Sequence, residues 1–327
     1  MPERTMVEAL NLAMDQCMER DHAVCMMGED IGINGGVFRV TKDLQAKYGS
    51  KRVMDAPLAE CGIIGTAVGM AIYGLKPVTE IQFSGFTMQA FDQIEQNMAR
   101  MRNRTQGRFN VSMVMRAPFG GGIRAVEHHS ESREAYWAHT PGLKVVIPSG
   151  PRNARALLAA SIEDPDPVVF YEPKAVYRAF REDVPDAYET MPIGKADVVR
   201  QGEAITVISY GAMMRVCHEA VDDLVDLHGV DVELIDLLSV SPMDTETIAN
   251  SVAKTGRCVI VHEGHSSCGI AAEVIARINE EAFEYLCAPI RRVTCPDLPF
   301  PYFQTEKHFL PDADSVIDAV RETIAWE

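Results

Sequence analysis

Residues 60–70 read ECGIIGTAVGM, an apolar run that begins with a glutamate and carries three glycines. Gly62, Gly65 and Gly69 are three and four positions apart, so they form one stripe on the helix predicted over 60–73. Each glycine inside a helix costs about 1 kcal/mol relative to alanine. Close approach of another backbone offsets such a cost, so the stripe predicts a tight helix-to-helix contact between subunits. A dinucleotide-binding fingerprint is the rival interpretation, but the stretch lacks the GxGxxG spacing.

Glu60 stands at the head of this apolar helix, with no basic residue nearer in the sequence than Lys51 and Arg52. One interpretation is a helix-start acid, which the helix macrodipole favours. The other is a carboxyl group in an apolar setting that donates or shares a proton. The spacing alone leaves both open.

The flanking sequence alternates apolar strands with helices. The strands are continuous apolar runs rather than alternating ones, which is typical of a buried, mostly parallel sheet in an α/β fold. For the first half we predict helices over 5–20 and 87–104, and strands over 23–27, 77–81, 111–116, 143–147 and 168–171.

After a polar, extended stretch at 181–190 the α/β pattern starts again. Here we predict strands over 205–210, 232–237 and 259–262, and helices near 213–226, 244–253 and 269–281. The 327 residues are therefore expected to form two domains, residues 1–185 and residues 191–327.

Composition excludes several classes of protein. The formal net charge of −16 repels phosphate backbones and anionic membranes, so neither nucleic acid nor membrane is an expected partner. The eight cysteines form no CxxC pair, which favours reduced, mostly buried thiols in a cytoplasmic protein. The first apolar stretch is interrupted by acids, unlike a signal peptide. The longest charge-free run, 61–75, carries four glycines and is too short for a bilayer span.

Two histidine clusters are candidates for chemistry, at 127–131 (EHHSE) and 262–265 (HEGH). Neither has the HExxH spacing that places two imidazoles on one helical face, so a metal hydrolase is a poor prediction. The 127–131 cluster follows a glycine-rich loop at 119–122, a setting that favours a functional histidine, whereas at least one of the others is expected to be structural. No GxSxG elbow, P-loop or EF-hand loop occurs, and no GDG with a downstream asparagine.

The 60–70 stretch resembles the pyrimidine-domain motif of thiamin diphosphate enzymes. Nearly the whole chain is similar to the beta subunit of the decarboxylating component of 2-oxo acid dehydrogenase complexes. The segments that carry this resemblance are 28–30 (GED), 35–39 (GGVFR), 47–49 (KYG), 80–83 (EIQF), 91–93 (FDQ), 129–130 (HS), 141–148 (PGLKVVIP) and 254–257 (KTGR).

The resemblance implies a thiamin diphosphate-binding pyrimidine-type domain followed by a transketolase C-terminal-like domain, assembled with an alpha subunit as an α2β2 heterotetramer. It implies that the alpha subunit holds the diphosphate and Mg²⁺, which agrees with the missing GDG motif. Glu60 then matches the glutamate that hydrogen-bonds the aminopyrimidine ring, and Leu58, Gln82 and Phe86 match positions lining its pocket. His129 matches the histidine implicated in reductive acylation of the lipoyl group, as a proton donor or orienting group.

In some members of that family a structural potassium ion is bound by a loop, mostly through backbone oxygens. The matching positions here are Met113, Ser161, Ile162, Asp164 and Asp166. An acidic turn stiffened by two prolines is the alternative for residues 163–167.

The resemblance also implies docking of the dihydrolipoyl acyltransferase, through its basic subunit-binding domain and its lipoyl domain. An acidic surface would steer that encounter. Phe86 favours pyruvate as the substrate, with branched-chain 2-oxo acids and then acetoin as alternatives. A non-catalytic interaction subunit that keeps the fold is the alternative of another class, and a free-standing transketolase-like enzyme is disfavoured by the missing diphosphate motif.

Overall fold

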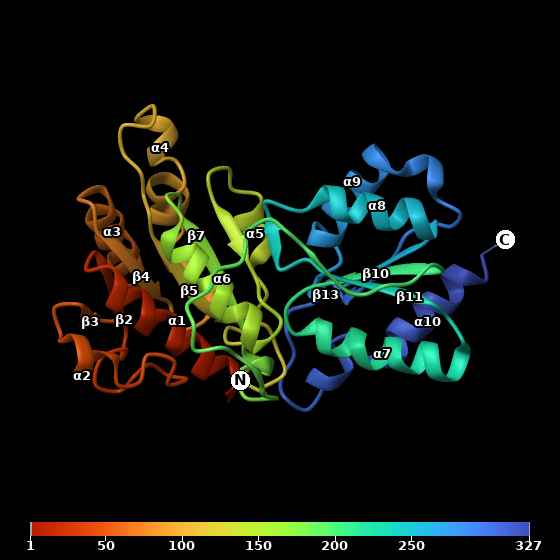
Figure 1. Cartoon of the computed structure of the whole chain (residues 1–327), viewed down its shortest axis with the longest axis horizontal. Helices are drawn as coiled ribbons and strands as arrows, with labels where there is room; N and C mark the ends of the chain where they lie inside the picture. Colours follow the sequence, from red (N-terminus) through yellow and green to blue (C-terminus); the bar gives the residue numbers. More distant parts are fainter. Residues whose placement is uncertain (1, 327) are drawn as a thin grey trace.

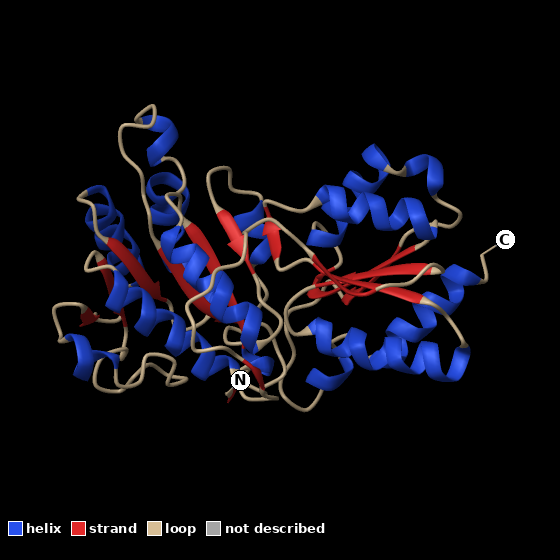
Figure 2. Cartoon of the chain, in the orientation of Figure 1, coloured by secondary structure: helices blue, strands red, loops and turns tan. Residues whose placement is uncertain are grey.

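Two β-sheets, one for each half of the chain, organise the fold, and helices cover both faces of each (Figures 1 and 2). The computed structural model describes residues 2–326. Two clusters of buried apolar side chains fill the space between sheets and helices, and each cluster runs through both halves. The predicted α/β class is confirmed.

The first sheet has seven strands in the order β12-β6-β7-β5-β4-β2-β3, all parallel except β12. Its strands are fully buried over most of their length, as the continuous apolar runs predict. They are β2 (Val24–Gly28), β3 (Val53–Asp55), β4 (Lys76–Glu80), β5 (Val114–Phe119), β6 (Lys144–Val146), β7 (Val168–Pro173) and β12 (Ser239–Ser241).

Five α-helices accompany this sheet in the described part of the first half, besides the short α4. A capping box between Thr5 and Glu8 starts the first of them, and proline at the first position starts the last. These helices are α1 (Met6–Arg20), α2 (Leu44–Tyr48), α3 (Glu60–Ile72), α5 (Glu134–Ala138) and α6 (Pro151–Glu163).

The single long helix predicted over 87–104 is wrong. The segment forms a 3₁₀ helix η1 (Ser84–Ala90), a π-helix η2 (Gln93–Met98) and the short α4 (Met101–Arg104). The Thr87 hydroxyl donates to the Ser84 carbonyl at 2.6 Å, which satisfies a group inside the tight first turn. The side chain of Gln93 reaches the α3 surface left open by Gly65. The helix type of this segment is thus linked to its packing against α3, which the spacing of apolar residues in the sequence does not reveal.

The second sheet has five strands in the order β14-β13-β10-β11-β9. Figure 2 shows it edge-on between two helical layers. The strands are β9 (Asp197–Arg200), β10 (Ile205–Ser209), β11 (Val232–Asp236), β13 (Cys258–His265) and β14 (Arg291–Cys295), and the helices are α7 (Met213–His228), α8 (Thr245–Thr255), α9 (Ile270–Glu281) and α10 (Ala313–Ile324). Short 3₁₀ turns are η3 (Lys174–Val176), η4 (Phe283–Tyr285) and η5 (Glu306–His308).

The chain leaves the first half through β8 (Glu182–Asp183), which pairs with β1 (Glu3–Arg4). We propose the predicted boundary near 185–191 for the two domains, since the second sheet begins with β9. One strand crosses this division, because β12 lies in the second half of the sequence and pairs with β6 of the first sheet. No helix within residues 2–326 has the length and apolar character needed to cross a bilayer.

Candidate active site

The candidate residues gather at one edge of the first sheet. Glu29 follows β2, Glu60 follows β3, Gln82 follows β4, His129 lies in the loop after β5, and Lys174 follows β7. These five strands are parallel neighbours, so their carboxyl ends lie on the same side, where open α/β sheets bind ligands.

Glu60 is the first residue of α3 and only 8% exposed. Within residues 2–326 its carboxylate has no ion pair and no hydrogen bond, so its oxygens are free to accept from a ligand. The neighbouring Glu29 is buried too, and burial followed by the charge of Glu60 raises the pKa of Glu29. A carboxylate in this setting suits a ligand that offers a hydrogen-bond partner or exchanges a proton.

His129 and Phe86, which are separate in the sequence, meet through aromatic contacts. The His129 ring lies 4.3 Å from that of Phe83 and 5.4 Å from that of Phe86 between centroids, both edge-on. The His129 Nδ1 atom is buried without a hydrogen-bond partner in the described chain. Burial, with the charges of Lys174 and His128, lowers the pKa of His129 and so favours the neutral imidazole.

The remaining predicted pocket residues differ in exposure. Gln82 is half-buried, whereas Leu58 is 81% exposed just before α3. A side chain added at Gly62 or Gly69 would meet no other part of the chain except Ala59. Gly62, Gly69 and Leu58 therefore lie on an open face, whereas Gly65 is covered by the Gln93 side chain. The predicted subunit contact there stays a prediction.

A buried ion-pair cluster supports the sheet below this edge. Arg116 on β5 donates to Glu80 on β4 at 2.9 Å and to both carboxylate oxygens of Glu172 on β7, at 2.6 and 3.0 Å. The Tyr177 hydroxyl donates to Glu172 at 2.6 Å. Every member is at most 4% exposed, so the cluster ties three adjacent strands together just beneath the candidate residues.

The other histidines differ in burial. His262 is fully buried, its ring stacks on Tyr210 at 6.1 Å, and both of its ring nitrogens lack a hydrogen-bond partner within residues 2–326. Burial lowers its pKa to about 4, which favours the neutral imidazole. The side chain of His128 is 65% exposed and lies 3.9 Å from Glu131. Within residues 2–326 no cluster of three histidine, cysteine or acidic side chains has metal-binding geometry.

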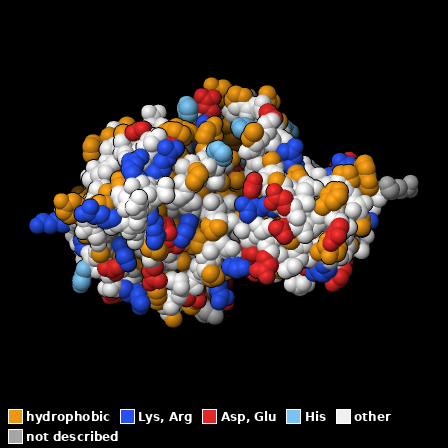
Figure 3. Space-filling model, turned by 90° about the horizontal axis from the view of Figure 1, so that it is seen from above, with side chains coloured by type: hydrophobic (Ala, Val, Ile, Leu, Met, Phe, Trp, Pro, Cys, Tyr) orange, Lys and Arg blue, Asp and Glu red, His pale blue; other side chains and the backbone are white. Residues whose placement is uncertain are grey.

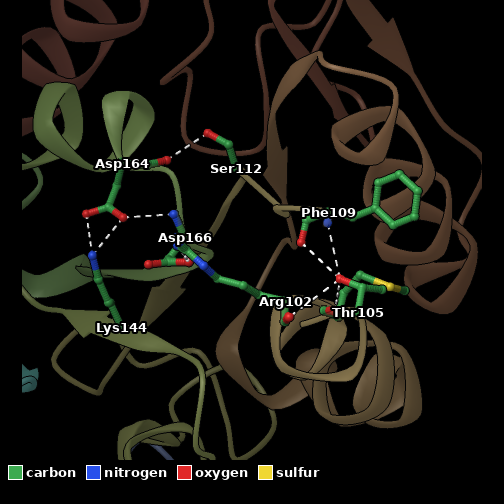
Figure 4. Close-up of polar contacts among 8 residues, drawn as sticks. Arg102, Thr105, Phe109, Ser112, Lys144, Asp164 and Asp166 are labelled. Atoms are coloured by element: carbon green, nitrogen blue, oxygen red, sulfur yellow. Dashed lines mark hydrogen bonds and ion pairs between the residues drawn. The ribbon is translucent and has the colours of Figure 1, made fainter. Parts of the chain in front are cut away.

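The loop predicted to hold potassium has its carboxylates directed at protein cations (Figure 4). Asp164 accepts from the Lys144 ammonium at 2.6 and 2.7 Å, and Asp166 pairs with Arg102 at 2.5 Å. The Ser161 hydroxyl donates to the carbonyl of residue 157. These side chains therefore do not fit a cation site. Binding by Met113, Ile162 and their neighbours stays a prediction that depends on backbone carbonyl oxygens.

A groove of about 680 Å³ lies between α5 and the loop that follows β13. It is lined by residues of both halves, among them Phe91, Tyr136, His139 and His265. Figure 3 looks down on the molecule and shows hydrophobic and histidine side chains gathered over the junction of the halves. The edge of the first sheet is thus bordered by the second half of the chain.

Comparison with known proteins identifies the class of this site. The family model of the transketolase pyrimidine-binding domain matches residues 3–179, and that of the transketolase C-terminal domain matches residues 194–316. A solved structure described as a split-gene transketolase, inactive beta4 tetramer, superposes with a TM-score of 0.80 over 99% of both chains at 21% identity, which shows the shared fold. The chain is therefore a protein of the transketolase-domain class.

Full-length relatives narrow the class to one family. The pyruvate dehydrogenase E1 component subunit beta of Acholeplasma laidlawii is 50% identical over 318 residues, 97% of each chain. That of Bacillus subtilis is 45% identical over 326 residues, 100% of each chain. The chain belongs to the family of pyruvate dehydrogenase E1 component beta subunits.

Sequence reasoning assigned no role to four residues in this region. Glu29 had a usable signal, because it directly follows a buried strand whose carboxyl end borders the site. Glu263 lies in the 262–265 cluster, which was considered only for metal binding, whereas Lys174 and Glu306 had no signal. These three residues come together only where the two halves meet.

Proposed function

We propose that this chain is the beta subunit of a thiamin diphosphate-dependent 2-oxo acid dehydrogenase, with pyruvate as the favoured substrate. The reaction would be oxidative decarboxylation with transfer of the acyl group to the lipoyl group of an acyltransferase. The main observation is Glu60, a residue that is 8% exposed and whose carboxylate has no protein partner within residues 2–326, at the carboxyl end of a pyrimidine-domain sheet. Relatives matched over the full chain support the same function.

Glu60 would hold the cofactor's aminopyrimidine ring through a hydrogen bond to a ring nitrogen. Bound thiamin diphosphate supplies an electron sink for decarboxylation. Its pyrimidine fits a site where one carboxylate lacks a partner and a second one, Glu29, lies close by with a raised pKa. Leu58, Gln82 and Phe86 would enclose the ring and exclude water, which strengthens the hydrogen bond to Glu60.

His129 would act on the acyl-transfer half of the reaction. Its neutral imidazole can donate through one nitrogen and accept through the other, as orientation or protonation of a lipoyl sulfur requires. The unpartnered Nδ1 atom supports this role, because the ring is held by Phe83 and Phe86 rather than by a hydrogen bond.

The partners would be an alpha subunit in an α2β2 heterotetramer, which would hold the diphosphate and Mg²⁺, and the subunit-binding and lipoyl domains of a dihydrolipoyl acyltransferase. A site completed by another chain is supported by the open face that Gly62 and Gly69 of α3 form beside the 81% exposed Leu58, since small residues let another backbone approach closely. The cytoplasm is the proposed location.

Branched-chain 2-oxo acids and acetoin are the alternative substrates, and Phe86 supports pyruvate over them. Specificity constants, kcat/KM, for pyruvate, 2-oxoisovalerate and acetoin on one preparation would rank the three. Equal or higher values for either rival would overturn the choice of pyruvate.

Replacement of Glu60 tests the function. In the complex with the alpha subunit, Glu60→Gln should lower pyruvate decarboxylation at least about 100-fold, since a group acting on proton transfer contributes that much. Assembly should be unchanged, and the exposed Glu273→Gln on α9 is the matched control. Activity within about twofold of wild type would refute the role of Glu60 and favour a non-catalytic interaction subunit.

A further inference from the structure

The loop between β5 and the His129 segment is held by three buried charged side chains from outside it. Glu263 on β13 accepts from the backbone N–H of Gly121 at 2.8 Å. Glu306 in η5 accepts from that of Gly122 at 2.6 Å. Lys174 donates its ammonium to the carbonyl of the preceding residue, 120, at 2.5 Å. The two carboxylates belong to the second half of the chain. The second half therefore holds a loop of the first half through hydrogen bonds, a set of contacts called the grip below.

The glycines of this loop leave no free space around these contacts. Gly120 and Gly122 have φ of +80° and +89°, a left-handed conformation that side chains disfavour. A Cβ atom at Gly120 would collide with the Glu263 carboxylate, and one at Gly122 would lie 2.8 Å from that of Ala175. The loop therefore has one close-fitting arrangement.

Gly120 also holds the far end of the segment that carries His129. The Gly120 N–H donates to the Glu131 carbonyl at 3.2 Å, and the Ser84 hydroxyl donates to that same carbonyl at 2.5 Å. Residues 121–130 thus form a loop that is closed at its base. Glu306 also accepts from the Arg124 N–H at 3.4 Å, and Gly85 packs against the His128 carbonyl. The contacts of Glu263 and Glu306 act at Gly121 and Gly122, where the loop leaves the sheet.

The charges make this grip unusual. Lys174, Glu263 and Glu306 are 3%, 6% and 4% exposed. Removing charged groups from water is costly, and such clusters do not in general add stability. Burial lowers the pKa of Lys174 and raises that of Glu263, while the attraction between the two groups opposes both shifts. Lys174 also lies 5.8 Å from the centroid of Phe83, whose ring contacts His129.

We propose that Glu263 and Glu306 are positioning residues that hold the 121–130 loop so that His129 is in place for transfer of the acyl group to the lipoyl arm. The inference rests on the function proposed above. It gives the second domain a part in the chemistry of the first. It also predicts different effects on the two half-reactions, decarboxylation and acyl transfer. Loosening the loop should impair acyl transfer, whereas decarboxylation depends on Glu60, which lies on α3 outside the loop.

The test measures both half-reactions of the complex with the alpha subunit, using an artificial electron acceptor for decarboxylation and an isolated lipoyl domain for acyl transfer. Glu263→Ala should lower kcat for acyl transfer at least about tenfold, the effect of losing a hydrogen bond to a charged group. KM for the lipoyl domain and the rate with the artificial acceptor should stay within about twofold. Glu263→Gln should recover most of the loss, because an amide oxygen still accepts from Gly121.

Glu233→Ala is the matched control. This glutamate is 2% exposed, pairs with Lys254 in the second domain and does not contact the loop. If Glu263→Ala fails to assemble, Glu306→Ala, which removes the acceptor for the Gly122 N–H, tests the same contact, and a selective loss of acyl transfer is again expected. Equal losses in both half-reactions, no loss in either, or no recovery by glutamine would overturn the inference. A wild-type complex that does not decarboxylate 2-oxo acids would instead overturn the proposed function.

Discussion

Arg116 is the buried cation on which the first sheet depends most, and its removal gives a sharp prediction. The guanidinium is fully buried and makes three hydrogen bonds to Glu80 and Glu172, which are 4% and 0% exposed. In Arg116→Met two carboxyl groups would remain in the core without a counter-charge. Breaking a buried pair in this way costs about 3–5 kcal/mol.

The assay is thermal unfolding of the purified complex at pH 7. For a chain of this size 1 kcal/mol corresponds to about 2 °C in Tm, so a decrease of about 6–10 °C is expected. The loss should be smaller at low pH, because protonation removes the charge on Glu80, whose pKa burial already raises. At neutral pH the triple variant with Glu80→Gln and Glu172→Gln should regain part of the loss.

Arg102→Met is the matched control, since it also removes an arginine that pairs with an acidic side chain, in this case at the surface. The Arg102 side chain is 47% exposed and pairs with Asp166, and exposed pairs contribute about 0–1 kcal/mol. If Arg116→Met changed Tm by no more than Arg102→Met, the reasoning that burial makes the Arg116 cluster indispensable would be refuted.

Three further predictions concern acid stability, backbone strain and the ion. The pKa of His262 is about 4 when folded and about 6.5 when unfolded, so the unfolded state gains a proton first as pH falls. Between pH 7 and 5 wild type should therefore lose about 2 kcal/mol more unfolding free energy than His262→Gln in urea titrations, and equal losses would contradict this. Gly120→Ala should lower Tm by at least about 2 °C, because alanine is strained at φ +80° and meets Glu263; an unchanged Tm would show that the loop can yield. Potassium held by carbonyl oxygens of residues 161–166 should stabilise the protein by about 1 kcal/mol relative to sodium when its concentration is about five times Kd. Identical unfolding midpoints in potassium and sodium salts would show that the loop binds no potassium.

The sequence by itself determined the class of fold and the family. Strands 24–28, 76–80 and 205–209 lie within one residue of their predicted bounds, because continuous apolar runs between polar turns depend on local composition. Helix α3 was predicted over 60–73 and ends at 72. The helices α6 and α10 were not predicted, although both carry local start signals: proline at the first position of α6 and a capping box between Asp312 and Ser315 in α10.

Site residues that directly follow strands could also be predicted in part. Glu60 and His129 were singled out from motifs, and the fold brings the segments that carry them to one edge of the sheet. What the motifs could not give is the environment of each group: the lack of a partner for Glu60, the aromatic contacts of His129, or the pairing of Asp164 with Lys144.

Only the tertiary structure decided the contacts between residues far apart in the chain. The winding of 84–104 depends on packing against α3, and the register of β12 with β6 joins the two halves. The grip of Glu263 and Glu306 on Gly121 and Gly122 spans more than 140 residues of sequence. Local periodicity reports which face of an element is buried, whereas the partner against which it is buried depends on the packing of the whole chain.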